Sequence, residues 1–121
     1  MNNIPISNKI PELDIAINAA QEAGNTILKI YEKDFKTFTK TDNSPVTDAD
    51  LQSNKIIKEI LSVTKHSILS EEDVDDKNRL SNDMVWIIDP LDGTSDFIDK
   101  TGEFTVMIAL VEKQKPILGV I

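Results

Sequence analysis

Two aspartates three residues apart directly follow an apolar run in the segment Trp86–Phe97, WIIDPLDGTSDF. Pro90 fixes its own φ and disfavours a helix at the residue before it, so Asp89 should stay extended like that run. Leu91 and Asp92 then turn the chain, which lets both carboxylates and the Leu91 carbonyl converge on one point. Hard oxygen ligands of this kind are typical of Mg²⁺, which binds few carboxylates together with water and substrate phosphate. The segment therefore predicts a magnesium site at the end of a strand.

The next two residues are suited to holding an anion. Gly93 permits a backbone conformation closed to other residues and lets a ligand approach the main chain. Thr94 adds a hydroxyl, and the backbone N–H groups after it could form an anion cradle at the start of a short helix. An EF-hand loop with Gly93 at its sixth position is excluded, because Ile88 would occupy its acidic first position and Pro90 its third.

Two other places concentrate carboxylates at the ends of expected elements: Asp48 with Asp50, and Glu71 with Glu72 and Asp73. Helix capping is the simpler interpretation of the first group, and a solvated acidic loop that of the second. Two unit charges about 5 Å apart repel by roughly 3 kcal/mol at an effective dielectric near 20. Gathering several such groups would cost a large share of a small domain's stability. If the groups do converge, a bound cation is the best explanation.

Apolar periodicity and turn residues predict the elements that must position these groups. Apolar residues at three- and four-residue steps predict a helix over 11–31. Gly24 within it costs about 1 kcal/mol relative to alanine, so we expect it to serve a close packing contact. A second helix should begin with Thr47 as its N-cap and continue to the apolar residues near position 61.

The remaining chain is expected to be mostly short strands and turns. The expected ranges are a polar, frayed start at 1–10, an extended segment at 35–41, a turn at 42–45, strands at 66–69, 84–88, 104–111 and 117–121, a loop at 71–83 and a hairpin connection at 113–116. The lone His66, at the start of a strand, is interpreted as structural. Met84, Trp86 and Met107 are interpreted as core residues. The expected fold is α/β in layers, with two amino-terminal helices packed on a mainly antiparallel sheet.

Length and composition set further bounds. At 121 residues the chain is one domain's worth, and 21 acidic residues against 13 basic ones give a net charge of −8. That balance, with no basic run, argues against nucleic-acid binding. The absence of cysteine excludes disulfides, thiolate metal sites and cysteine nucleophiles. No apolar run reaches membrane-spanning length and no secretory signal is visible, so a cytoplasmic location is expected, with peripheral inner-membrane association left open.

Three segments in order resemble a known family. DPLDGTSDF (Asp89–Phe97) is closely similar to the first signature of the inositol monophosphatase family of Mg²⁺-dependent, lithium-sensitive phosphatases, and SPVTDAD (Ser44–Asp50) and SEED (Ser70–Asp73) resemble two further family segments. Within the family, SEED, GEFTVMIAL and the final PILGVI look most like bacterial 3′(2′),5′-bisphosphate nucleotidases. Those enzymes convert adenosine 3′,5′-bisphosphate to AMP and phosphate in sulfur metabolism. The resemblance covers nearly the whole chain from about Ile15.

The resemblance implies roles for particular residues. Four residues would supply metal ligands: the side chains of Glu71, Asp89 and Asp92 and the carbonyl of Leu91. Asp50 and Thr94 would be catalytic, orienting or deprotonating a metal-bound water. The groups expected to contact substrate are Glu71, Leu91, Asp92, Gly93 and Thr94, the last two through backbone N–H groups. Glu72 is the less certain neighbour of Glu71.

The implied cofactor is Mg²⁺, as two or three ions, with Mn²⁺ as a possible substitute. Such ions can generate hydroxide near neutral pH and stabilise the leaving alkoxide during in-line attack on a phosphate monoester. The implied partner is a small phosphorylated metabolite, and a homodimer is possible.

One departure from the family pattern bears on domain organisation. The family's second signature, a Trp-Asp pair followed by small residues, has no counterpart, because Trp86 is the single tryptophan and Ile87 follows it. Residues 1–121 are therefore expected to be the amino-terminal, metal-binding part of a longer phosphatase whose carboxy-terminal domain is absent. Little or no turnover is expected from these residues alone.

Three alternatives stay open. The enzyme could be an inositol monophosphatase or a sugar bisphosphatase. The chain could instead be an inactive metal-binding or folding unit that exposes a sheet edge. An acidic partner-binding module without metal is the third, and it predicts no stabilisation by Mg²⁺ or Mn²⁺.

Overall fold

The computed structural model describes residues 11–121, and the expected frayed segment 1–10 lies outside these described residues. Two long helices, α1 (Pro11–Tyr31) and α2 (Asp48–Leu61), begin where the sequence predicts. The strands are β1 (Thr37–Thr39), β2 (Pro45–Thr47), β3 (Ser67–Ser70), β4 (Met84–Asp92), β5 (Thr105–Glu112) and β6 (Lys115–Val120). A short helix α3 (Thr94–Ile98) follows β4, and two 3-10 turns lie at Ser62–Thr64 and Asn78–Ser81.

The four longer strands form one sheet in the order β3-β4-β5-β6, while β1 and β2 form a separate antiparallel hairpin. β3 runs parallel to β4, and the β4–β5 and β5–β6 pairs are antiparallel. The parallel pair is made possible by the long connection through residues 71–83. The predicted mainly antiparallel sheet is thus confirmed, with one parallel edge pair.

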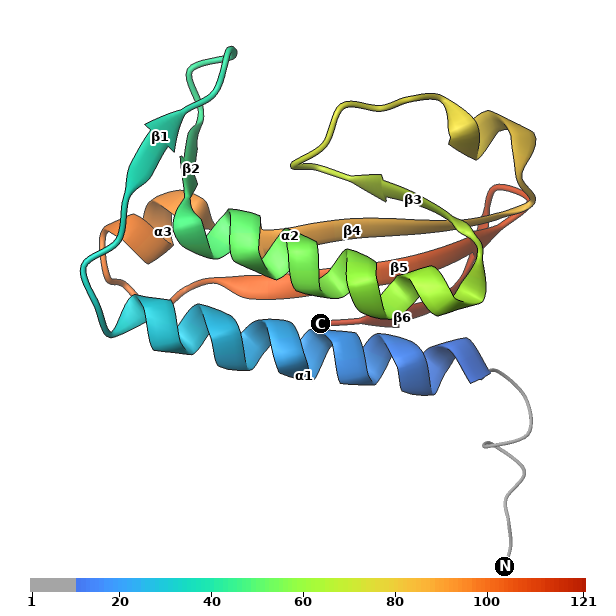
Figure 1. Ribbon diagram of the computed structural model, residues 1–121, viewed down its shortest axis with the longest axis horizontal. Coiled ribbons are helices and arrows are strands. Elements are labelled where there is room, and N and C mark those ends of the chain that lie inside the picture. The colour runs from blue at the N-terminus through green and yellow to red at the C-terminus, as the bar shows by residue number, and fades with distance from the viewer. Residues whose placement is uncertain (1–10) are drawn as a thin grey trace, which may run out of the picture.

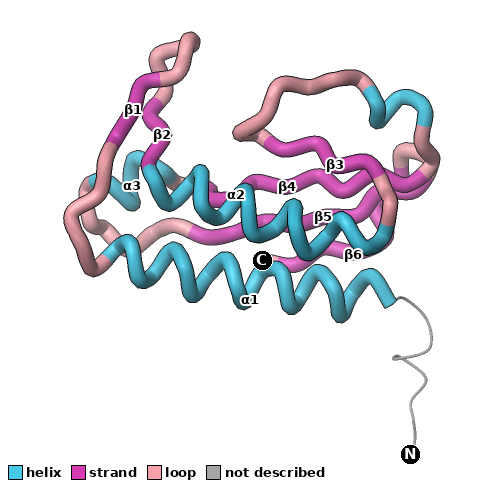
Figure 2. Tube along the Cα trace, in the orientation of Figure 1, coloured by secondary structure: helices cyan, strands magenta, loops and turns pink. Residues whose placement is uncertain are grey.

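Helices α1 and α2 lie side by side over one face of this sheet (Figures 1 and 2). Ala16, Ala19 and Ala23 are fully buried on α1, and such small side chains allow the two helices to approach closely. From the sheet, Trp86, Ile88, Ile108 and Leu110 point into the same core. Period-two alternation along β4 and β5 puts these residues on the helix-covered face.

The opposite face of the sheet carries no helix in the described chain (Figure 1). Its apolar residues include Ile87 and Met107, which are 43% and 39% exposed. The prediction that Met107 belongs to the core is therefore wrong, because it alternates with buried Val106 and Ile108 and falls on the open face. Trp86 is fully buried, as predicted, and Met84 packs at the margin of the core.

Two further expectations need correction. β4 does not stop at Ile88 but continues through Asp92, with a register shift against β5 between Asp89 and Asp92. Such a bulge tolerates Pro90, whose missing N–H leaves a ladder position empty. The close contact expected at Gly24 is absent: apart from its chain neighbours and the adjoining backbone of α1, no described atom lies within 4 Å of the position that its Cβ would take.

Candidate metal centre

The start of α2 is built by a capping box. The Thr47 hydroxyl oxygen accepts from the Ala49 and Asp50 N–H groups at 3.1 and 3.4 Å, and Asp50 Oδ1 accepts from the Thr47 N–H at 2.7 Å. Asp50 is fully buried. Its second oxygen accepts from the Thr94 hydroxyl at 2.7 Å, a contact across 44 residues that joins α2 to the start of α3. Asp50 and Thr94, predicted to act as a pair, are therefore in direct contact.

Asp48 does not join them. Its Oδ2 accepts from the Lys36 N–H at 3.1 Å at the base of the β1–β2 hairpin. The capping interpretation, which the sequence favours for the first acidic group, thus fits Asp50, which also faces the site, whereas Asp48 bonds to a residue outside α2.

Asp89–Gly93, called here the β4 corner, is held by its own main chain and by α2. The Ser53 hydroxyl donates to the Pro90 carbonyl at 2.7 Å, and Leu91 is only 2% exposed. Gly93 has a φ of 92°, and a Cβ there would lie 2.7 Å from the carbonyl oxygen of Glu103. A side chain at position 93 is therefore excluded both by conformation and by space.

Ser70–Asp73, called here the acidic turn, follows the parallel strand β3. The Glu71 N–H donates to the Ile88 carbonyl at 3.2 Å, which extends the β3–β4 pairing by one step and places Glu71 beside the end of β4. The Glu72 carboxylate, only 3% exposed, pairs with the Lys40 ammonium at 2.8 Å. Lys40 lies at the tip of the β1–β2 hairpin, so this ion pair links the hairpin to the turn.

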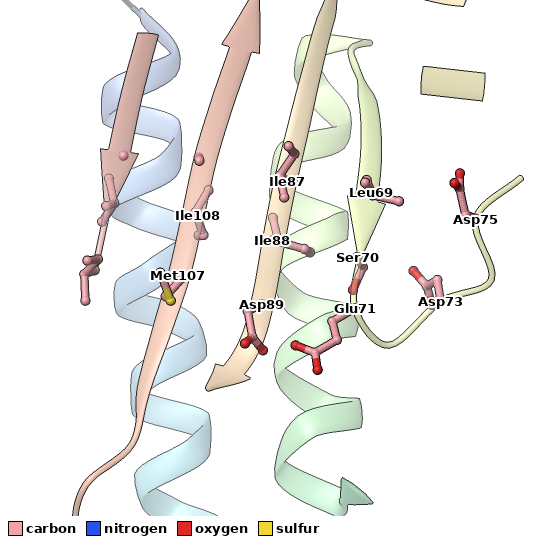
Figure 3. A pocket seen from close by; sticks show the side chains of 14 residues that line it. Leu69, Ser70, Glu71, Asp73, Asp75, Ile87, Ile88, Asp89, Met107 and Ile108 are labelled. Carbon is pink, nitrogen blue, oxygen red and sulfur yellow. The ribbon is translucent and has the colours of Figure 1, made fainter. Parts of the chain in front are cut away.

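The acidic turn and the β4 corner meet. Carboxylate oxygens of Glu71, Glu72 and Asp89, called here the carboxylate cluster, all lie within 4.8 Å of one another. Figure 3 shows the Glu71 and Asp89 side chains pointing toward each other at the ends of β3 and β4. Among the described residues Asp92 is outside this group of three, although it is close enough for its charge to act on Asp89. Glu72, the less certain neighbour in the sequence, is inside it.

The electrostatics of the carboxylate cluster follow from this crowding. Burial, the hydrogen bond and charge of Glu71 and the charge of Asp92 raise the pKa of Asp89 to about 7. Burial also raises the pKa of Glu72, although Lys40 opposes the rise. Burial works against the Lys40 ammonium, but its hydrogen bond to Glu72 and the nearby carboxylates raise its pKa above the usual value. The cluster thus holds negative charge that a divalent cation would stabilise.

The donor set fits Mg²⁺. All of its atoms are hard oxygens, and they come from two segments, the acidic turn and the β4 corner. The Leu91 carbonyl lies 3.4 Å from the Thr94 hydroxyl, beside the contact between Thr94 and Asp50. With a pKa of about 7 the crowded Asp89 carboxyl is only partly ionised near neutral pH, and a bound cation would favour its charged form.

His66 lies elsewhere. Its Nε2 is 3.0 Å from a Glu12 carboxylate oxygen, and its ring lies beside Trp86 at a centroid distance of 6.4 Å. These contacts tie the start of α1 to the residue before β3 and to β4, and they agree with the structural interpretation.

Sequence reasoning missed three residues that support the site: Lys40, Ser53 and Asn54. Their partners are 32, 37 and 16 residues away along the chain. Helical spacing from Asp50 puts Ser53 and Asn54 on its face of α2, and that is the signal which could have pointed to them.

Comparisons with known proteins match most of the chain. Residues 9–121 match the model of the inositol monophosphatase family. The chain is 44% identical over 114 residues to a 3′(2′),5′-bisphosphate nucleotidase CysQ from Buchnera aphidicola, and 42% identical to the protein of that name from Escherichia coli K12. Each alignment covers 90% of this chain but only 43% and 46% of the relative. The chain thus spans less than half the length of these relatives.

Solved structures show the same similarity. CysQ from Bacteroides thetaiotaomicron, described as a bacterial member of the inositol monophosphatase family, is 47% identical with a TM-score of 0.77 over 91% of this chain and 41% of that one. The suppressor protein suhB from Bartonella henselae is 29% identical with a TM-score of 0.81, over 92% and 44%. The fold expected from the sequence is confirmed. In residues 11–121, none of the helices combines the length and apolarity needed to cross a bilayer.

Proposed function

Since the chain belongs to the inositol monophosphatase family, we propose that the protein is a Mg²⁺-dependent phosphomonoesterase that hydrolyses adenosine 3′,5′-bisphosphate to AMP and phosphate. Relatives named 3′(2′),5′-bisphosphate nucleotidase CysQ, at 42–44% identity, favour this substrate over inositol phosphates and sugar bisphosphates. The observation that carries the proposal is the meeting of Glu71, Glu72 and Asp89 within 4.8 Å.

In this proposal four residues hold the two or three metal ions: Glu71, Asp89, Asp92 and, through its carbonyl, Leu91. Glu72 lies beside them and is neutralised by Lys40. When bound, the ions supply Lewis acidity and a hydroxide nucleophile near neutral pH. Mn²⁺ has the same preference for oxygen donors and is proposed as a substitute.

Asp50 and Thr94 are proposed to handle the proton of the attacking water. The Thr94 hydroxyl donates to Asp50 Oδ2, so the lone pairs of its oxygen remain available to accept from a water molecule. A proton leaving that water passes to Thr94 Oγ1 while the Thr94 proton passes to Asp50. The Thr47 N–H and hydroxyl hold Asp50 Oδ1 at 2.7 Å each, so the carboxylate cannot turn away.

Gly93 and Thr94 are proposed to hold the phosphate through their backbone N–H groups. The missing side chain at Gly93 supports this role, because it leaves the main chain accessible where the strand ends.

Domain organisation is part of the proposal. Residues 1–121 are taken as the amino-terminal, metal-binding part of a longer phosphatase, because they match less than half the length of the relatives. The open apolar face of the sheet, with Ile87 and Met107, supports this view, since it is suited to packing against further chain. A cytoplasmic location, inhibition by lithium and a homodimer complete the proposal.

The test is phosphate release with Mg²⁺ from adenosine 3′,5′-bisphosphate, inositol 1-phosphate and fructose 1,6-bisphosphate. It is made on the natural protein that carries these residues and, separately, on the 121-residue chain. We expect the natural protein to prefer the nucleotide at least tenfold, and EDTA to abolish turnover. Preference for inositol phosphate would move the protein to another branch of the family. Robust turnover by the 121 residues alone would overturn the proposed domain organisation.

Asp50→Asn is the matched variant for mechanism. Its amide keeps the shape of the carboxylate, and the Thr94 hydroxyl can rotate to accept from it, so the fold should persist. Turnover should fall by a factor of about 10² or more, because the proton acceptor is lost. Full activity in this variant would remove Asp50 from the mechanism.

A non-catalytic acidic module is the second candidate, favoured by the net charge of −8. A thermal-shift titration of the 121-residue chain with Mg²⁺ and Mn²⁺ separates the two candidates, because only a metal centre predicts a rising unfolding temperature.

A further inference from the structure

One edge of α2 contacts each acidic segment of the site. Asp50, Ser53 and Asn54 are buried polar residues at helical spacings of three and four. Asp50 binds the Thr94 hydroxyl, Ser53 donates to the Pro90 carbonyl, and Asn54 bonds to the acidic turn. Asp50 has a place in the proposed mechanism, whereas Asn54 has none.

The carboxamide of Asn54 bridges both ends of the acidic turn. The Ser70 hydroxyl donates to Asn54 Oδ1 at 2.6 Å, and Asn54 Nδ2 donates to Asp73 Oδ1 at 3.0 Å. The Ser70 hydroxyl oxygen also accepts from the Glu72 N–H at 3.2 Å, and the Asp73 N–H donates to the Ser70 carbonyl at 3.2 Å. Asn54, Ser70 and Asp73, called here the Asn54 clamp, therefore fix the two peptides between them.

Those two peptides carry Glu71 and Glu72, two of the three members of the carboxylate cluster. Their backbone sits between Ser70 and Asp73, and Figure 3 shows Glu71 directed at Asp89 from this turn. Asn54 and Ser70 are 8% and 4% exposed, so solvent cannot readily replace the bond between these two residues if it is broken.

Few side chains other than asparagine can bond to both Ser70 and Asp73 in this way. Its amide offers an acceptor to Ser70 and a donor to Asp73 at the same time. Aspartate at position 54 would keep the bond from Ser70 but would place a carboxylate 3 Å from that of Asp73. Alanine would leave Ser70 and Asp73 without this partner.

We propose that Asn54 is a positioning residue for the metal centre: through Ser70 and Asp73 it fixes the backbone from which Glu71 and Glu72 reach Asp89. This inference rests on the proposed metal centre, but it assigns a role to a residue that touches neither metal nor substrate.

The experiment measures Mn²⁺ binding to the 121-residue chain by electron paramagnetic resonance, at a temperature where each variant is fully folded. Asn54→Ala should weaken Mn²⁺ binding about tenfold, and without metal it should accelerate amide hydrogen exchange at residues 71–73 with α1 unchanged. A merely structural role would lower the unfolding temperature and leave the affinity of the folded protein intact. That outcome would overturn the proposal.

A polarity swap makes the test specific. Asn54→Asp alone should weaken Mn²⁺ binding, because two carboxylates then face each other. Combined with Asp73→Asn it should recover most of the affinity, because the donor and acceptor have only exchanged places. Failure of the double variant to recover would overturn the proposal, and this comparison suffices if Asn54→Ala does not fold.

Lys58→Met is the matched control. It removes the 2.7 Å ion pair to the other Asp73 oxygen and leaves the clamp intact, so affinity should change less than twofold. Absence of Mn²⁺ binding in the unaltered chain would count against the proposed metal centre itself. Binding by the unaltered chain with equal binding by Asn54→Ala would count against the clamp alone.

Discussion

The β4 corner and the acidic turn contribute carboxylates to the same cluster but are held in different ways. At the corner, the main-chain course is determined by Pro90, the left-handed Gly93 and the bulge against β5, and α2 adds a single bond from the Ser53 hydroxyl to the Pro90 carbonyl. The turn is instead held by side chains from other elements: Asn54 of α2 bonds to Asp73, and Lys40 of the hairpin pairs with Glu72. The position of the β4 corner therefore depends mainly on its own backbone, whereas that of the acidic turn depends on other elements.

This difference predicts that substitutions in the two regions have different effects. Changes at the corner should act on folding, because they oppose the backbone itself. Substitutions around the turn should lower the free energy of unfolding less, and should act mainly on the positions of the carboxylates.

Gly93→Ala should have the largest effect, since it breaks the corner. The new methyl group would lie 2.7 Å from the Glu103 carbonyl at a φ of 92°. We expect the free energy of unfolding to fall by about 3 kcal/mol in urea titrations. Gly119→Ala is the control, because apart from its chain neighbours no described atom lies within 4 Å of its added methyl, and it should stay within about 0.5 kcal/mol of the unaltered chain. A fully stable Gly93→Ala variant would contradict the left-handed corner.

Ser53→Ala weakens the same corner from outside. It removes the donor 2.7 Å from the Pro90 carbonyl in a buried setting, and an unsatisfied acceptor there should cost about 2 kcal/mol. Ser62→Ala, which removes an exposed hydroxyl bonded to the Glu59 carbonyl, should cost less than about 0.5 kcal/mol. Equal losses in the two variants, measured by urea unfolding, would show that α2 does not support the corner.

The pH dependence of stability reports on the contact between corner and turn. The pKa of Asp89 is raised to about 7 in the folded chain, which therefore binds more protons than the unfolded chain between its ordinary value of 3.8 and about 7. This contribution is present at low pH and lost as pH rises through about 7. Glu72, also raised, acts in the same direction.

We expect the free energy of unfolding of the metal-free chain to fall by on the order of 1–2 kcal/mol between about pH 5 and pH 8. This is less than the full pKa shift of Asp89 implies, because Asp89 still reaches solvent. Urea unfolding in EDTA across this range measures it. Asp89→Asn should flatten the slope, and an unchanged slope in that variant would mean that other groups cause the dependence.

Lys40→Met should have the smallest effect of the four predictions in this comparison, and it tests whether the hairpin supports the acidic turn. It leaves the nearly buried Glu72 carboxylate without its cation, and we expect a loss of about 1 kcal/mol in the free energy of unfolding near pH 7. Lys58→Met breaks the more exposed pair with Asp73 and should cost less than about 0.5 kcal/mol. The reverse ranking, in thermal or urea unfolding, would contradict the idea that the hairpin supports the turn.

Local signals predicted much of the fold. Apolar periodicity located α1 from Pro11 to Tyr31, and Thr47 was correctly expected as the N-cap of α2. The four strands of the larger sheet were found within a few residues because β-branched and apolar runs are bounded by turn residues, whereas β2 (Pro45–Thr47) was not expected. The extension of β4 through Asp92 was missed, since a proline in a strand normally ends it and only the bulge against β5 makes Pro90 acceptable.

The sequence by itself determined the elements and the chemistry available at their ends, because helix periodicity, capping and turn residues act over a few neighbouring residues. Only the tertiary structure decided which side of the sheet is covered, and so that Met107 lies on the open face. It alone decided that Glu72 is buried against Lys40 and that Asn54 holds the acidic turn. Contacts between residues 16 to 44 positions apart leave no periodic trace in the sequence, because they depend on how whole elements pack.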